Sequence, residues 1–180
     1  MSHSDLHLMV KAIRFAAEKH RHQRRRDIEA SPYINHPIAV AAVLSAEAGV
    51  EDVSVLCACI LHDTIEDTDT TEAELLREFG PAITTLVAEC TDDRTLPRAE
   101  RKALQIAHAA QLSPGARLVK LADKISNLRD ILATPPKDWP SAAKEEYFDW
   151  ASAVIDRIRG SHAGLEASFD SLIARRSEFA

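Results

Sequence analysis

The stretch Val53-Ser-Val-Leu-Cys-Ala-Cys-Ile-Leu-His-Asp-Thr-Ile-Glu-Asp67 joins the most apolar segment of the chain to an acidic turn. Its periodicity predicts a helix over residues 51–66. Because this helix is apolar on nearly every side up to Leu61, we expect it to lie at the centre of a helical bundle. The apolar run Val55–Leu61 is far shorter than the roughly 20 residues that cross a bilayer, so no membrane span is expected.

The polar end of this helix has two interpretations. Carboxylates at a helix C-terminus face the negative end of the helix dipole and one another, which is unfavourable unless a cation is bound. His62 and Glu66 are four residues apart, as are Asp63 and Asp67. In a continuous helix each second residue lies about 6 Å further along the same face. The pattern is therefore typical either of a solvated helix end or of a metal-holding turn followed by a turn that faces a metal-bound water.

The rest of the chain also predicts helices. It has 29 alanines and only 5 glycines, and alanine is the best helix former. Proline and glycine stand mostly between apolar-periodic segments, where helices begin and end. The predicted helices span residues 4–24, 37–48, 51–66, 72–79, 81–91, 97–111, 115–132, 141–159 and 162–176, with irregular segments at 27–35 and 134–140. No strand pattern or internal repeat is visible, so the fold class is a single all-α domain.

Two further segments carry candidate metal ligands. His36 precedes the helix at 37–48, and Asp123 lies on the amphipathic helix at 115–132. Each one alone is typical of a buried, hydrogen-bonded polar residue. Together with His62 and Asp63 they supply two imidazoles and two carboxylates, a set that suits Mn²⁺, Fe²⁺, Zn²⁺ or Mg²⁺ better than a structural zinc site.

The charge pattern favours a small phosphorylated ligand. The net charge of −6 argues against a general nucleic-acid binder. Basic residues nevertheless gather at 19–26, and a second group comprises Arg94, Arg98, Arg101 and Lys102. Both groups are consistent with solvated helix ends. Beside a metal site they would instead form a clamp for a multiply phosphorylated substrate.

The expected location is the cytoplasm. The first residues lack a basic segment followed by an apolar one, so no secretory signal is predicted. The three cysteines, Cys57, Cys59 and Cys90, do not match a redox or zinc-binding spacing, and we expect them to be reduced core residues.

The motifs, taken together and in order, resemble those of the HD-domain (p)ppGpp hydrolases, the hydrolase domain of RelA/SpoT proteins. The likeness is greatest to the stand-alone small alarmone hydrolases, including their metazoan members. It runs from about residue 6 to residue 176 and rests on Arg25-Arg26, Pro32–Pro37, Leu61–Asp67, Thr91–Pro97, Val119–Arg129 and Glu146–Trp150. It implies one HD-type helical bundle over residues 1–180, with a core at about 6–176 and no synthetase or regulatory domain.

The resemblance also implies residue roles. His36, His62, Asp63 and Asp123 match the metal ligands, normally for one Mn²⁺ per chain, and Glu66 and Asp67 match the catalytic acidic pair. Six further residues match positions that line the nucleotide pocket, namely Arg25, Arg26, Tyr33, Arg98, Asn127 and Tyr147. The implied reaction is hydrolysis of ppGpp or pppGpp at the 3′ position by a Mn²⁺-activated water, giving GDP or GTP and pyrophosphate.

Two alternatives remain open from the sequence. One keeps the fold and changes the substrate, to the 2′-phosphate of NADPH or to another nucleotide. The other is a non-catalytic alarmone sensor, which we disfavour because all six predicted ligand and catalytic residues are present. In each case the partner is a small nucleotide, with no nucleic acid or membrane involved. The sequence does not predict the oligomeric state.

Overall fold

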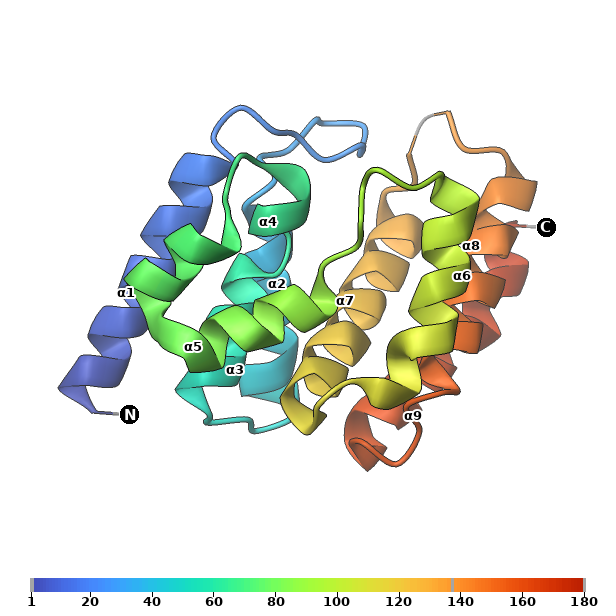
Figure 1. Ribbon diagram of the computed structural model, residues 1–180. Helices are drawn as coiled ribbons and strands as arrows, with labels where there is room; N and C mark the ends of the chain where they lie inside the picture. The colour runs from blue at the N-terminus through green and yellow to red at the C-terminus, as the bar shows by residue number, and fades with distance from the viewer. Residues whose placement is uncertain (1, 137, 180) are drawn as a thin grey trace.

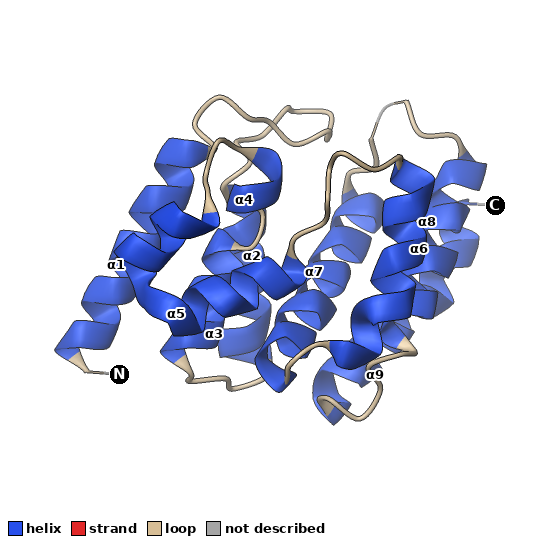
Figure 2. Ribbon diagram, viewed as in Figure 1, coloured by secondary structure: helices blue, strands red, loops and turns tan. Residues whose placement is uncertain are grey.

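The computed structural model describes residues 2–136 and 138–179, and these residues are helical wherever they are regular (Figure 2). In that part of the chain the only β pairing is an isolated bridge between Arg24 and Pro32. The elements are α1 (His3–Lys19), α2 (Asn35–Ala42), the π-helical turn η1 (Val43–Glu47), α3 (Val53–Leu61), α4 (Thr64–Asp67), α5 (Glu72–Cys90), α6 (Arg98–His108), the 3₁₀ turn η2 (Ala109–Gln111), α7 (Pro114–Ala133), α8 (Ser141–Ile155), α9 (Ala163–Ala174) and the 3₁₀ turn η3 (Arg175–Phe179). The predicted all-α class is confirmed.

Helix α3 lies at the centre of one half of the bundle. Asp52 caps its first turn by accepting from the backbone N–H groups of Ser54 and Val55. All of residues 55–61 are buried, and α3 packs against α1, α2, α5 and α7. The central position expected from its apolar sequence is therefore confirmed.

Helix α7 joins this half to the other half of the molecule. It packs against α2, α3 and α5 on one side and against α8 and α9 on the other (Figure 1). The loop that follows α1, the short helix α4, the loop that follows α5 and the loop that follows α7 all lie at one end of the bundle (Figure 1). This end of the bundle therefore gathers segments that are far apart in the sequence.

Three predicted helix boundaries are wrong. The first helix ends at Lys19 rather than at residue 24, because the next residues turn back and pair Arg25 N–H with the Ser31 carbonyl, and Tyr33 N–H with the Gln23 carbonyl. The helix predicted over 51–66 breaks at residues 62–63 into α3 and α4. Helix α8 ends at Ile155 rather than at residue 159.

Gly80 interrupts the helical backbone between two of the predicted helices. The predicted helices at 72–79 and 81–91 form one element, α5, which bends at Gly80 with φ 77° and ψ 173°. Glycine accepts this left-handed conformation without a Cβ penalty, and Pro81 then restarts the helix. The Thr71 side chain caps α5 by accepting from Glu74 N–H, at the predicted N-terminus.

Cys57, Cys59 and Cys90 are free and buried, as predicted. Among residues 2–136 and 138–179, no helix is long and apolar enough to cross a membrane. The irregular segment predicted at 134–140 separates α7 from α8, and position 137 within it lies outside the described residues.

Candidate functional site

The four predicted metal ligands converge at the end of the bundle where the loops gather. His36 comes from the first turn of α2, His62 and Asp63 from the junction of α3 and α4, and Asp123 from the middle of α7. Asp123 Oδ1 lies 3.1 Å from His36 Nε2 and 3.7 Å from His62 Nε2. Asp63 Oδ2 lies 3.2 Å from His62 Nε2 and 3.7 Å from His36 Nε2. His36, His62 and Asp123 each place one ligand atom within 4.8 Å of the other two.

The two histidines are oriented as metal-binding histidines are. His62 Nδ1 donates to the Cys59 carbonyl at 2.7 Å, so that its Nε2 faces the carboxylates of Asp63 and Asp123. This Nε2 is buried and has no hydrogen-bond partner among the described residues. His36 Nδ1 lies 3.4 Å from Ser126 Oγ, so its Nε2 also faces the cluster. An unpartnered imidazole nitrogen beside two carboxylates fits a divalent cation.

The charges at this cluster favour a bound cation. Burial alone would raise the pKa of Asp63, but the adjacent His62 and His36 hold it well below its ordinary value. Burial likewise opposes ionisation of Asp123, and Lys124 with the two histidines lowers its pKa. Asp123 is also fixed in place, because its Oδ1 accepts from Asn127 Nδ2 at 2.6 Å and its Oδ2 pairs with Lys124 Nζ at 3.0 Å. Two ionised, immobilised carboxylates therefore face the same small volume.

The break between α3 and α4 brings the second acidic pair to the site. Asp63 takes φ −95° and ψ −3°, and the Thr64 hydroxyl donates to the Leu61 carbonyl, so the backbone turns immediately after the metal ligands. Glu66 and Asp67 then lie on a separate helical turn, α4. The interruption is local, because the Asp67 N–H still donates to the Asp63 carbonyl at 2.8 Å, so Asp67 lies one turn beyond Asp63 as their spacing predicts.

Glu66 and Asp67 have different partners. Glu66 pairs with Arg101 Nη1 at 3.1 Å and accepts from Asp92 N–H at 3.1 Å. Burial, together with the carboxylate of Asp92, raises the pKa of Glu66 to about 7, a value suited to a general base at neutral pH.

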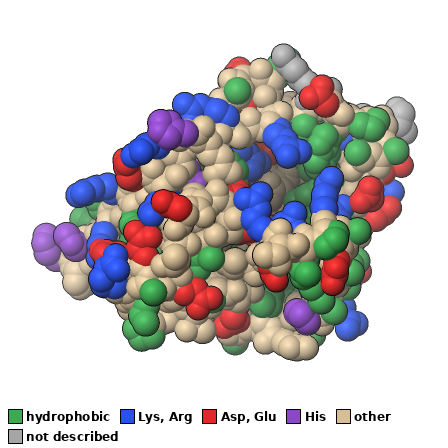
Figure 3. Space-filling model, turned by 45° about the horizontal axis from the view of Figure 1, so that its top comes forward, with side chains coloured by type: hydrophobic (Ala, Val, Ile, Leu, Met, Phe, Trp, Pro, Cys, Tyr) green, Lys and Arg blue, Asp and Glu red, His purple; other side chains and the backbone are tan. Residues whose placement is uncertain are grey.

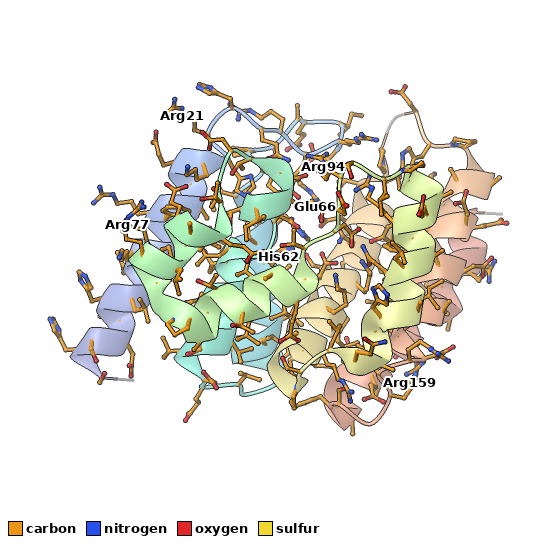
Figure 4. The ribbon with its side chains drawn as sticks, in the orientation of Figure 1. Arg21, His62, Glu66, Arg77, Arg94 and Arg159 are labelled. Atoms are coloured by element: carbon orange, nitrogen blue, oxygen red, sulfur yellow. The ribbon has the colours of Figure 1, made fainter. Side chains whose placement is uncertain are left out.

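Asp67 pairs with Arg94 Nη1 at 3.0 Å and accepts from Gln23 Nε2 at 2.8 Å. Arg94 also donates to the Glu66 carbonyl at 3.0 Å, and the two residues lie close together in Figure 4. One arginine from the loop after α5 therefore contacts both residues of the acidic pair.

A cavity of about 520 Å³ opens beside the metal cluster. Figure 3 shows Lys and Arg side chains gathered around a hollow on this face of the molecule. Residues from the loop after α1, from α7 and from the 134–140 segment form most of its wall. Its lining residues include Arg24, Arg25, Arg26, Tyr33, His36, Asp67, Arg94, Asn127, Asp130, Trp139 and Tyr147.

Within this cavity Arg25 is held in a fixed position. Its Nη2 donates to Asp130 Oδ2 at 2.6 Å and to Asn127 Oδ1 at 3.1 Å. Its guanidinium carbon lies 5.8 Å from the centre of the Tyr33 ring. The side-chain amide of Asn127 therefore links the guanidinium of Arg25 to Asp123, one of the predicted metal ligands, because its oxygen accepts from Arg25 and its nitrogen donates to Asp123.

Five of the six pocket residues expected from the resemblance line this cavity: Arg25, Arg26, Tyr33, Asn127 and Tyr147. Arg98 is exposed at the first residue of α6 and is not part of the lining. Glu66 is not part of the lining either, since it lies behind Arg94 and Arg101.

Sequence reasoning missed Gln23, Asp130 and Trp139. Gln23 and Asp130 are ordinary polar residues that only the folded chain brings to the cavity. The sequence contains one weak indication of a binding role for Trp139, since it is an aromatic residue in a Pro-rich irregular segment. Its ring lies 5.9 Å from that of Tyr147, and such a pair of rings can stack against a planar base.

Comparisons with known proteins point to one family. The profile of the HD domain family matches residues 12–151. The guanosine-3′,5′-bis(diphosphate) 3′-pyrophosphohydrolase MESH1 of Homo sapiens is 51% identical over 168 residues, covering 93% of this chain and 94% of the relative. The protein of the same name from Xenopus tropicalis is 50% identical over 169 residues, covering 94% of both chains.

A solved structure is similar over nearly the whole fold. It is described as a metazoan ortholog of SpoT that hydrolyses ppGpp and plays a role in starvation responses. It matches with a TM-score of 0.92 and 44% identity over 94% of this chain and 95% of its own. The profile match covers most of the chain and the relatives align almost from end to end, so this chain belongs to the HD-domain family.

Proposed function

We propose that this protein is a metal-dependent guanosine-3′,5′-bis(diphosphate) 3′-pyrophosphohydrolase, which converts ppGpp and pppGpp to GDP and GTP with release of pyrophosphate. The observation that carries the proposal is the juxtaposition of a two-His, two-Asp cluster with a 520 Å³ cavity lined by arginines. The metazoan relatives with this activity in their names are about half identical to the chain over nearly its full length.

His36, His62, Asp63 and Asp123 would hold one divalent cation, which we propose to be Mn²⁺. When bound, such a cation supplies a Lewis acid for the phosphoryl group and lowers the pKa of water. Glu66 would accept a proton from the attacking water, since its raised pKa matches neutral pH. Asp67, held by Gln23 and Arg94, would orient that water.

The walls of the cavity supply substrate contacts. Arg25, Arg26 and Arg94 would bind the phosphate groups and stabilise the charge that develops on them. Tyr33, Asn127 and Tyr147 would line the nucleotide site, with Trp139 added by the structure. Arg98, at the outer end of α6, remains a proposed contact for a phosphate that extends beyond the cavity.

Two broader proposals accompany this function. One is that residues 1–180 act as a single HD-type phosphohydrolase domain with its core at about 6–176. The other is a cytoplasmic location, which the three free buried cysteines support, because disulfides are rare in that compartment.

The test is turnover by the purified protein with Mn²⁺, with products separated by chromatography. ppGpp should give GDP and pyrophosphate in equal amounts. NADPH and a set of deoxynucleoside triphosphates form the other arms of the panel. Preferred release of phosphate from NADPH would replace the proposed substrate while keeping the fold and the metal. Tight ppGpp binding without turnover would instead indicate an alarmone sensor.

A further inference from the structure

His20 is a buried histidine that neither ligates the metal cluster nor lines the cavity. It follows the last residue of α1 and is only 2% exposed. Its Nδ1 lies 2.6 Å from Gln23 Oε1, while its Nε2 is buried with no hydrogen-bond partner among the described residues. Its ring stacks on that of Tyr33, with the ring centres 4.8 Å apart.

Gln23 connects this histidine to the proposed catalytic pair. Its Nε2 donates to Asp67 Oδ2 at 2.8 Å, and its backbone N–H donates to the His20 carbonyl at 2.9 Å. Asp67 also pairs with Arg94, so it faces Gln23 as a carboxylate, which can only accept hydrogen bonds. The amide nitrogen of Gln23 must therefore face Asp67, and its oxygen must face His20.

This orientation determines the tautomer of His20. Because Gln23 Oε1 can only accept, the His20 nitrogen beside it must carry the proton. A proton on Nε2 alone would bury an unpaired N–H group and place two lone pairs opposite each other across 2.6 Å. The Nδ1–H tautomer avoids both costs.

We infer that His20 and Gln23 are positioning residues that hold the Asp67 carboxylate for the hydrolytic reaction. His20 Nδ1–H fixes the amide of Gln23, and the amide fixes Asp67 on the side opposite Arg94. The catalytic role of Asp67 rests on the proposed function, whereas the chain of hydrogen bonds from His20 through Gln23 to Asp67 does not. The alternative is that His20 acts only through its stacking on Tyr33, whose hydroxyl donates to the metal ligand Asp63 at 2.6 Å.

Substitutions of His20 separate the two roles. In His20→Asn the amide NH₂ takes the place of Nδ1–H, so the donor to Gln23 is retained without the aromatic ring. In His20→Phe the ring is retained and the donor is lost. In His20→Gln the side-chain amide extends to the position of Nε2, so no donor stands at the position of Nδ1 beside Gln23. Gln23→Met keeps the length of the side chain and removes both hydrogen bonds.

The relay predicts that His20→Asn retains kcat within about threefold, while His20→Phe, His20→Gln and Gln23→Met lower it about tenfold, the usual effect of one hydrogen bond. Metal content should stay unchanged in all four, and the loss in the three slow variants should appear in kcat more than in KM for ppGpp. His20→Phe combined with Gln23→Met should be no slower than Gln23→Met alone, since both interrupt one chain. His7→Asn and His7→Phe, at an exposed histidine within α1, are the matched controls.

The reverse order would overturn the inference. If His20→Phe is as active as the wild type and His20→Asn is impaired, stacking on Tyr33 is the role of His20. If Gln23→Met has wild-type kcat, Asp67 needs no support from this side. Wild-type turnover is measured in the same assay, so absence of ppGpp hydrolysis by the wild type would refute the proposed function separately.

The tautomer can be tested without turnover. Nitrogen-15 NMR of the Zn²⁺-loaded protein distinguishes Nδ1–H from Nε2–H histidine rings, with the His20 signals assigned by their loss in His20→Phe. The relay predicts Nδ1–H for His20 in the wild type and a mixture of tautomers in Gln23→Met. An Nε2–H ring in the wild type would contradict the hydrogen-bond order, whatever the substrate proves to be.

Discussion

Glu66 and Asp67 are adjacent in the chain but are held from opposite directions. Glu66 faces Arg101 and the backbone of Asp92, whereas Asp67 faces Arg94 and Gln23. Only Asp67 lines the cavity. The two carboxylates therefore differ in their partners and in their access to the cavity, which suits a base and an orienting group with separate tasks.

Replacing Glu66 with Gln should abolish the proton acceptor at nearly constant size. Turnover should fall by about 10²–10⁴-fold, the usual size of a general-base contribution. Metal content and ppGpp affinity, measured on the same sample, should be unchanged. Near-normal turnover would show that Glu66 is not the base. Asp67→Asn should also be slow, and the double variant should be far from additive if both residues act on one water.

Glu66 should also make stability depend on pH. Its pKa is about 7 in the folded protein, above its ordinary value of 4.5, so between these two values the folded state retains a proton that the unfolded state loses. The contribution of Glu66 to stability is therefore fully present below about pH 4.5 and is lost as the pH rises through 7. Between pH 4.5 and pH 8 this effect should lower the free energy of unfolding of the wild type by about 1–3 kcal/mol. Glu66→Gln should not show this decrease.

The measurement for this pH effect is urea unfolding of the metal-free protein at several pH values. Glu72→Gln, at an exposed position in the first turn of α5, is the control. Parallel curves for the wild type and Glu66→Gln would contradict the raised pKa.

Arg25 should contribute more to phosphate binding than Arg26, which is exposed. Replacing both with alanine should raise KM at least about tenfold, with metal content and helix content intact. Part of the rise should disappear at high salt, because ions screen the long-range attraction. Arg25→Ala alone also leaves the Asp130 carboxylate without its arginine partner in the cavity. Adding Asp130→Ala should therefore reverse part of the rise in KM. Unchanged kinetics would show that these arginines are solvated surface residues that do not bind the substrate.

At the scale of elements, two breaks in helices shape the site. The break at residues 62–63 lets His62 and Asp63 face Asp123 while Glu66 and Asp67 turn toward the loop after α5. The bend at Gly80 gives α5 two segments. The first lies beside α1, where Glu74 pairs with Lys19, and the second leads to α7, where Lys120 Nζ donates to the Cys90 carbonyl (Figure 1). A straight helix would not reach both places.

The bend is testable through Gly80→Ala. A Cβ at this position would meet nothing within 4 Å, so the cost is in the backbone alone. With φ at 77°, alanine should destabilise the fold by about 1 kcal/mol or more, which thermal unfolding would show as a drop of roughly 2–4 °C per kcal/mol. Ala82→Gly, two residues further along the same helix, tests helix propensity separately. An unchanged midpoint for Gly80→Ala would mean that the bend is not required.

At the scale of the whole molecule, the proposed metal site would join both halves of the bundle. Its ligands come from α2, from the α3–α4 junction and from α7, the helix that contacts both halves. A cation bound there stabilises the folded state by mass action, since the unfolded chain does not hold the four ligands together.

Removing the metal should therefore lower the melting temperature. With metal at about 100 times its Kd the stabilisation is about 2.7 kcal/mol, which corresponds to about 5–10 °C for a chain of this size. Melting in Mn²⁺, then in chelator, then after Mn²⁺ is restored gives the measurement. His62→Ala and Asp63→Ala should bind no metal and show no such shift. A shift of equal size in these variants would place the metal elsewhere.

Much of the site was predictable from local sequence, for physical reasons. Helix positions follow from apolar periodicity and from capping residues such as Thr71 and Gly80, which act within a few residues. The metal ligands stood out because His62 and Asp63 end the most apolar helix, where uncompensated polar groups are costly.

The sequence by itself determined the all-α class, the central helix and the four ligand candidates, because each depends on interactions along the chain or on the cost of burying charge. Only the tertiary structure decided that the helix breaks at Asp63, that Glu66 and Asp67 have separate partners, and that Arg98 stands outside the cavity. Those outcomes depend on contacts between residues 26 to 105 positions apart, such as Glu66 with Asp92 and Arg25 with Asp130. Periodicity carries no information about such distant contacts, because it reports which face of a helix is buried and not what covers it.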